Sequence, residues 1–177
     1  MPAEGSNSLS LPPLETLEKT PDILKALLVG ATQDALEWKP APDRWSISEV
    51  LAHLVETEQV FRKRAKAMVE EESPFLQSFD QNASYAAGNY SKHDAKEYLH
   101  QFCHERDLTV TFLRYLPAAA GARKARHSEL GEITLNELVN EWAFHDLGHI
   151  RQISELYRSR AFYPHMGGFR KYYTVKP

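Results

Sequence analysis

The chain has 177 residues, enough for one domain with a substantial buried core. With 42% hydrophobic residues, 25% charged residues and a net charge of -3, it has the composition of an ordinary globular protein. It contains neither a long basic stripe, which nucleic-acid binding would favour, nor an apolar stretch long enough to cross a membrane.

The first residues, 1–12, are rich in serine, proline and small side chains, so we predict a mobile tail before a domain of residues 13–177. This segment lacks the basic region and apolar run of a secretory signal. The single cysteine, Cys103, cannot form an internal disulfide, and we expect it to be packed and unreactive. These features lead us to expect a cytoplasmic protein.

The first helix is predicted to begin at Thr20. Thr20 can cap a helix, Pro21 suits the first helical position, and an apolar face follows as far as Gly30. An additional earlier turn around Leu17 stays open. A further short helix is predicted within residues 31–38, before the Lys-Pro-Ala-Pro segment that follows.

The second helix has the clearest beginning in the sequence. Ser46 and Glu49 form a capping box, and Trp45 and Val50 have the spacing of a hydrophobic staple. Apolar residues then recur with helical spacing to about residue 70.

The least regular stretch covers residues 71–90, and loops this long inside a domain are often functional. We expect it to fold back onto the protein because it carries four aromatic side chains, Phe75, Phe79, Tyr85 and Tyr90. Ser91 and Asp94 then repeat the capping pattern for a third helix, which Pro117 ends.

The fourth helix is predicted from Thr134, which forms a second capping box with Glu137, to about Arg158. The aromatic segment after it is expected to be non-helical and to pack against the domain. Because no stretch shows sustained strand alternation, we predict an all-α protein, a four-helix bundle with irregular N-terminal and C-terminal tails.

Two histidines in the fourth helix suggest a metal site. His145 and His149 are four residues apart, so their side chains lie on one face of the helix, about one turn apart. On a helical wheel His149 falls inside the apolar stripe and His145 at its edge. Buried imidazoles need polar partners, and a metal ion can serve two of them.

A third ligand is expected from another helix, and His53 in the second helix is the best candidate. Three histidine ligands leave one coordination position open, as in reactive metal sites. His100 and His104 form a rival pair with the same spacing in the third helix. We interpret that pair as part of a mixed polar surface that includes Arg106.

Two segments together resemble the DinB/YfiT-like superfamily: WSISEVLAHL at 45–54 and HDLGHIRQI at 145–153. The resemblance extends over about residues 20–158. It implies a helical bundle in which His53, His145 and His149 bind one divalent metal ion, commonly zinc or nickel.

Neighbouring polar residues are candidates for supporting roles. Gln152 lies one turn beyond His149 and could orient a ligand. Asp146 lies in the core stripe and either accepts a hydrogen bond from an imidazole or forms a structural ion pair. Glu56 and Thr57 are expected to border the site. No catalytic residue can be assigned.

Three neutral imidazoles favour Zn²⁺, Ni²⁺ or Fe²⁺. The resemblance implies an enzyme that activates a low-molecular-weight thiol for transfer to an electrophile. One alternative is a hydrolase that uses metal-bound water; another is a non-enzymatic, stress-related metal-binding module. A homodimer is also expected, with Phe144 as a candidate contact and packing of Phe144 against the tail as the alternative.

Overall fold

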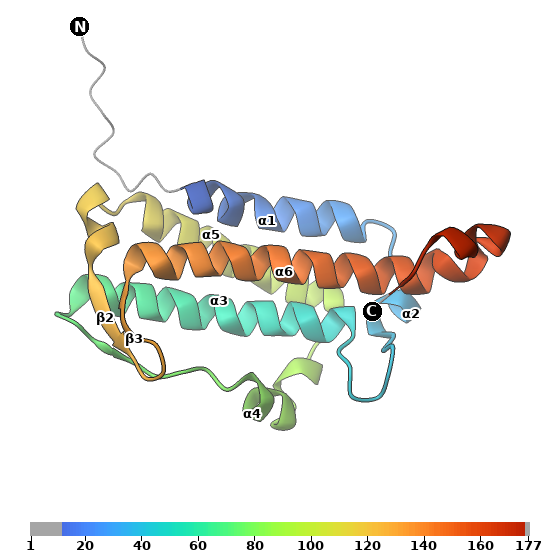
Figure 1. Ribbon diagram of the computed structural model, residues 1–177, viewed down its shortest axis with the longest axis horizontal. Coiled ribbons are helices and arrows are strands. Elements are labelled where there is room, and N and C mark those ends of the chain that lie inside the picture. Colours follow the sequence, from blue (N-terminus) through green and yellow to red (C-terminus); the bar gives the residue numbers. More distant parts are fainter. Residues whose placement is uncertain (1–11, 176–177) are drawn as a thin grey trace, which may run out of the picture.

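The computed structural model describes residues 12–175. Its main feature is a group of four long helices, α1 (Pro12–Leu28), α3 (Ile47–Glu70), α5 (Ala95–Arg114) and α6 (Leu135–Ala161). They lie side by side, with α1 and α3 each in contact with both α5 and α6 (Figure 1). The predicted all-α four-helix bundle is confirmed. The predicted tail lies outside the described residues except for Pro12, with which α1 begins.

Shorter elements connect and extend the bundle. Within residues 12–175 these are two short α-helices, three strands and four 3₁₀ helices: α2 (Gln33–Glu37), β1 (Phe75–Leu76), α4 (Gln81–Ala86), η1 (Asn89–Ser91), η2 (Ala118–Ala122), β2 (Lys124–His127), β3 (Gly131–Thr134), η3 (Tyr163–His165) and η4 (Gly167–Tyr172). The short helix predicted within residues 31–38 is therefore confirmed as α2, with Thr32 as its N-cap.

The direction of the helices explains the long connection after α3. In Figure 1, α1 and α6 run from left to right, whereas α3 and α5 run from right to left. The neighbours α3 and α5 are parallel, so a short turn cannot join them. Residues 71–94 must instead return along the length of α3, which is about 36 Å for its 24 residues. This crossover, residues 71–94, brings its aromatic side chain Tyr90 to His53 of α3.

Both predicted capping boxes are present. Ser46 Oγ accepts from the Glu49 N–H at 3.2 Å, and the Glu49 carboxylate accepts from the Ser46 N–H at 2.8 Å. Thr134 and Glu137 make the equivalent pair of bonds at the start of α6. These bonds satisfy N–H groups that have no partner inside the helix, and they fix where α3 and α6 begin.

The predicted start of the first helix at Thr20 is wrong, because α1 begins at Pro12 and continues through Pro21. Thr20 Oγ1 donates to the carbonyl of Thr16, four residues earlier. Pro21 has no N–H for the carbonyl of Leu17, but Arg106 donates to that oxygen at 2.8 Å. A guanidinium from another helix thus supplies the missing bond.

The third helix also begins later than the capping pattern predicts. Ser91 belongs to η1, and the N-cap of α5 is Asp94. The carboxylate of Asp94 accepts from the backbone N–H groups of Lys96 and Glu97, both at 2.9 Å. The negative charge of this carboxylate is also stabilised by the positive end of the helix dipole. This explains why Asp94, rather than Ser91, caps the helix.

A small three-stranded sheet, which the sequence analysis did not predict, lies at the end of the bundle where α6 begins. β2 and β3 form an antiparallel hairpin joined by residues 128–130, and Gly131, which begins β3 after this turn, has a φ of +76°. β1 pairs parallel to β2 and so fixes the start of the crossover. Strands of two to four residues are too short to show an alternating pattern in the sequence.

The C-terminal tail differs from its prediction. It forms the 3₁₀ helices η3 and η4, and Phe169 is 69% exposed rather than packed. Because α6 continues straight to Ala161, it carries the tail beyond the ends of the neighbouring helices (Figure 1). The tail still makes some contacts with α6. The ring of Phe162 contacts the ring of Tyr157, and Arg158 donates to the carbonyl of Thr174.

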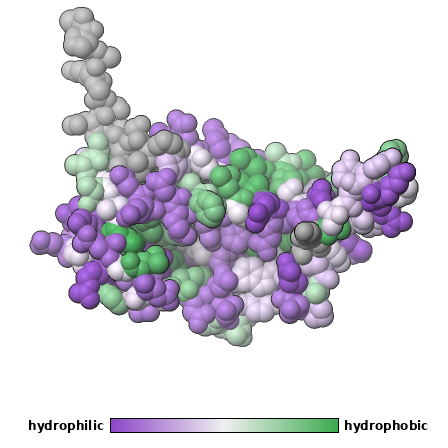
Figure 2. All heavy atoms as spheres, in the orientation of Figure 1, coloured by the Kyte–Doolittle hydropathy of each residue, from purple (hydrophilic) through white to green (hydrophobic). Residues whose placement is uncertain are grey.

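The surface is mainly hydrophilic in the view of Figure 2, with hydrophobic atoms gathered over the neighbouring faces of α1 and α6. Exposed apolar side chains on these helices include Ile23, Phe144 and Leu147. Among the described helices, none combines the length and the apolar character needed to cross a membrane.

Candidate metal centre

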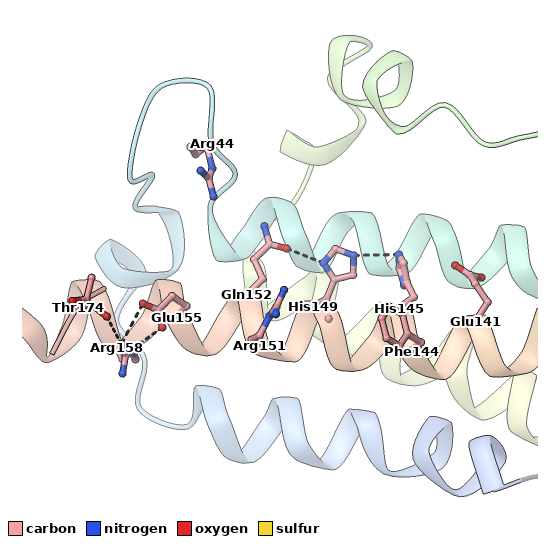
Figure 3. Close-up of a pocket in the computed structure, with 11 residues that line it drawn as sticks. Arg44, Glu141, Phe144, His145, His149, Arg151, Gln152, Glu155, Arg158 and Thr174 are labelled. Carbon is pink, nitrogen blue, oxygen red and sulfur yellow. Dashed lines mark hydrogen bonds and ion pairs between the residues drawn. The ribbon is translucent and has the colours of Figure 1, made fainter. Parts of the chain in front are cut away.

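Three imidazole rings from two helices meet inside the bundle. His53 comes from α3, and His145 and His149 come from successive turns of α6. The Nε2 atom of His145 lies 3.2 Å from the Nε2 atoms of both other rings. Figure 3 shows His145 and His149 on the side of α6 that faces α3. One ring nitrogen of each residue lies within 4.8 Å of the other two.

The crossover holds the ring of His53 in place. His53 Nδ1 lies 3.0 Å from the hydroxyl of Tyr90, which is buried. Burial and the neighbouring carboxylate of Glu56 raise the pKa of Tyr90, so its hydroxyl stays protonated. The rings of Trp45 and Phe79 also contact His53, with centroids 5.1 Å and 6.3 Å away.

The ring of His149 is oriented by its own helix. Its Nδ1 lies 2.9 Å from Oε1 of Gln152, the residue for which the sequence suggested this role. An amide oxygen only accepts hydrogen bonds, so the ring proton lies on Nδ1. The Nε2 lone pair of His149 therefore points toward the other two rings, which is the arrangement found in metal-bound histidines.

All three rings are held in the neutral form. Burial lowers the pKa of His53 to about 3 and that of His145 to about 4, and it also lowers the pKa of His149. Repulsion between the neighbouring rings lowers the first two pKa values further. Neutral imidazoles offer lone pairs at neutral pH, as a metal ion requires.

A buried ion network lies next to the three rings. Arg106 is only 1% exposed and donates to the carboxylates of Glu58 and Asp146, and Trp142 Nε1 also donates to Glu58. The interpretation of Arg106 as a surface residue is therefore wrong. Burial alone would lower its pKa, but the two carboxylates raise it, so the guanidinium remains charged. Asp146 forms the structural ion pair considered in the sequence analysis.

An open cavity of about 810 Å³ borders the rings on one side. His145, His149 and Gln152 line its wall, and charged side chains from α6 and from the loop before α3 surround it. Figure 3 shows Arg44 of that loop above α6, with Arg151 on the helix below. A small molecule could therefore approach the three rings from this side.

The family of the chain follows from its sequence. The profile of the DinB superfamily matches residues 16–153. The chain belongs to the DinB superfamily. The predicted resemblance is thus confirmed, and it extends over most of the bundle.

Two curated proteins resemble the chain at low identity. "Putative metal-dependent hydrolase OB0782" of Oceanobacillus iheyensis is 22% identical over 144 residues, covering 81% of this chain and 83% of that protein. "Uncharacterized protein YuaE" of Bacillus subtilis is 25% identical over 142 residues, covering 73% of this chain and 87% of that protein.

A solved structure of similar fold is YfiT from Bacillus subtilis, described as "a probable metal-dependent hydrolase with an unusual four-helix bundle topology". The two structures share a TM-score of 0.76 at 23% sequence identity, covering 88% of this chain and 92% of YfiT. At this identity the likeness shows the fold alone, a four-helix bundle.

The structure separates the candidate residues into two groups. Among the described residues, His53, His145 and His149 form the one group of three or more potential ligands placed to share an ion. The rival residues, His100 and His104, are exposed on α5. Burial raises the pKa of Cys103, as expected of an unreactive thiol.

The remaining candidates have structural roles. Thr57 is buried, and its hydroxyl donates to the carbonyl of His53 at 2.8 Å, within α3. Glu56 accepts from the hydroxyl of Ser84 in the crossover at 2.5 Å. The contact of Tyr90 with His53 was not predicted, because only the general expectation that the crossover folds back pointed to it.

Proposed function

We propose that the chain is a metal-dependent enzyme that binds one divalent ion through His53, His145 and His149. The convergence of three neutral ring nitrogens beside an open cavity carries this proposal. The names of the Oceanobacillus iheyensis relative and of YfiT, both described as metal-dependent hydrolases, add support.

The donor set fits such an ion. Nitrogen ligands at about 2.0–2.1 Å from a tetrahedral zinc ion lie about 3.3 Å apart, close to the two Nε2–Nε2 distances of 3.2 Å. Three imidazoles suit Zn²⁺, Ni²⁺ or Fe²⁺. Among the described residues, no fourth potential ligand joins the three histidines. This favours a reactive site over a closed structural one.

The protein would contribute orientation of the ligands and access for a substrate. Tyr90 and Gln152 hold the rings of His53 and His149 with their Nε2 atoms toward the ion. The cavity admits a small molecule to the open coordination position. A divalent ion held there would act as a Lewis acid and make a coordinated water or thiol nucleophilic at neutral pH.

For the reaction, we propose hydrolysis of a small molecule, because the descriptions of two relatives support it. Transfer of a low-molecular-weight thiol stays a prediction from the sequence. Titration of the cobalt-substituted protein with physiological thiols separates the two reactions. A thiolate-to-cobalt charge-transfer band would favour thiol transfer, and an unchanged spectrum would favour hydrolysis.

Metal analysis of the purified protein tests the ligand set. We expect about one equivalent of divalent metal in the native protein and almost none in His149→Ala, because two imidazoles hold an ion far more weakly than three. His104→Ala is a matched control, because His104 belongs to an HxxxH pair outside the site. Equal metal content in native protein and His149→Ala would contradict the proposal.

A further inference from the structure

The cavity beside the three rings contains an excess of positive charge. Its lining includes three arginines, Arg44, Arg151 and Arg158, and two glutamates, Glu141 and Glu155. The two histidines that line it, His145 and His149, are neutral, because burial lowers their pKa values. A divalent ion at the rings would add two further positive charges.

The pairing of these side chains shows which charges remain available. Arg158 lies 2.6 Å from the carboxylate of Glu155 and also donates to the carbonyl of Thr174 (Figure 3). Neither Arg44 nor Arg151 has a side-chain hydrogen bond or ion pair with any described residue, although both line the cavity. Two guanidiniums are therefore free to bind an anion there.

Both free guanidiniums line the cavity that His145 and His149 also line. Arg44 directly precedes Trp45, whose ring contacts His53. Arg151 follows His149 by two residues in α6. In Figure 3 the side chains of Arg44 and Arg151 lie on the same side of His149, whereas Glu141 lies beyond His145 on the other side. Glu155, which pairs with Arg158, lies on the side of the arginines, so that end of the cavity has an excess of positive charge and the other end carries Glu141.

From this arrangement we infer that the substrate is a small molecule with an anionic group, a carboxylate or a phosphate, that Arg44 and Arg151 bind. The inference rests on the proposed metal-dependent function, because the reacting group of the same molecule would reach the open position at the rings. Guanidinium groups match the planar oxygen pairs of carboxylates and phosphates. The anionic group would then orient the substrate along the cavity.

Binding of hydroxamates to the cobalt-substituted protein tests this inference without an assay of activity. Hydroxamates chelate the metal, and the visible spectrum of cobalt reports their binding. The matched probes are butyrohydroxamate, which is uncharged, and the monohydroxamate of succinate, which has a carboxylate in place of its terminal methyl group. The monohydroxamate of glutarate tests a longer reach, and the monohydroxamate of phosphonopropionate tests a phosphate-like group.

We expect at least one of the anionic hydroxamates to bind about tenfold more tightly than butyrohydroxamate, as a charge-assisted hydrogen bond would give. Arg44→Gln and Arg151→Gln should each reduce this advantage severalfold and leave the affinity for butyrohydroxamate unchanged. Arg126→Gln is the control, because Arg126 is exposed on β2, away from the cavity lining, and its removal changes the net charge equally.

The outcomes distinguish a failure of the substrate inference from a failure of the proposed metal-dependent function. If cobalt and butyrohydroxamate bind but no anionic probe binds more tightly, the substrate inference is overturned and the metal site stands. An equal loss of anion affinity in Arg126→Gln would also overturn it, because only general charge would then be acting. If the protein binds no cobalt, the proposed function fails and the inference fails with it.

Discussion

Arg106 supplies to α1 the hydrogen bond that Pro21 cannot make. The proline interrupts the backbone ladder at the carbonyl of Leu17, and Arg106 Nη1 donates to that oxygen at 2.8 Å from α5. The same guanidinium pairs with Glu58 of α3 and Asp146 of α6, the residue that follows His145. One buried side chain therefore connects all four long helices beside the candidate metal centre.

Arg106→Leu should destabilise the protein strongly. The substitution leaves two buried carboxylates without a cation, and breaking such a network costs about 3–5 kcal/mol. Urea unfolding followed by circular dichroism measures the change. Arg114→Leu in the same helix is the control, because its pair with Glu18 is about half exposed and such pairs contribute about 0–1 kcal/mol. Similar losses in the two variants would show that the buried network has no special role.

Tyr90→Phe should weaken metal binding with little change in fold. It removes the hydroxyl that lies against His53 Nδ1 but keeps the buried ring, and loss of such a partner lowers metal affinity about 10–100-fold. Competition with a chromophoric chelator gives the dissociation constant for zinc. Tyr85→Phe, in the same crossover, removes a hydroxyl that bonds Lys39 instead, and it should bind zinc normally. Unchanged affinity in Tyr90→Phe would exclude a role for this contact.

The metal-free protein should lose stability as the pH falls below about 6.5. The pKa of His53 is about 3 in the folded state and that of His145 about 4, whereas unfolded histidines have the ordinary value of 6.5. Between these values the unfolded chain binds more protons than the folded chain, so acid favours unfolding. This part of the stability is complete above pH 6.5 and is lost progressively as the pH falls toward 3.

Urea unfolding between pH 4 and pH 7.5 measures that dependence. His53→Gln should show a shallower decrease than the native protein, because one of the groups that must bind a proton has been removed. His104→Gln, an exposed substitution on α5, should follow the native curve. A His53→Gln curve parallel to the native one would contradict the assignment of a buried neutral ring.

The expected homodimer can be tested at Phe144. The ring is 81% exposed on α6, so the alternative, that it packs against the tail, is wrong. If Phe144 lies in a dimer interface, Phe144→Asp should shift the protein to monomer in sedimentation equilibrium, because an interface core does not tolerate a buried charge. Tyr115→Asp is the control, because Tyr115 is 86% exposed just after α5. A native protein that is monomeric at all concentrations would refute the expectation.

The features predicted correctly depend on residues close together in the sequence. The capping boxes join residues three apart, such as Ser46 and Glu49, and the inward direction of His145 and His149 follows from helical periodicity alone. His53 was the best candidate for a third ligand from its position in the second helix, and the family resemblance of two short motifs supported that choice.

The features that were missed depend on partners far apart in the sequence. Arg106 bonds to Leu17 across 89 residues and to Glu58 across 48, so nothing near Pro21 or Arg106 indicates that either is accommodated in the bundle. Tyr90 reaches His53 across 37 residues because the parallel direction of α3 and α5 forces the crossover back along the bundle. Topology, rather than local pattern, decides these contacts.

X-ray absorption spectroscopy of the zinc-loaded protein tests the central claim most directly. We predict three imidazole nitrogens at about 2.0–2.1 Å and one exchangeable light-atom ligand, with one imidazole fewer in His53→Gln. A native spectrum with fewer than three imidazoles, or one that His53→Gln leaves unchanged, would contradict a metal centre shared by α3 and α6.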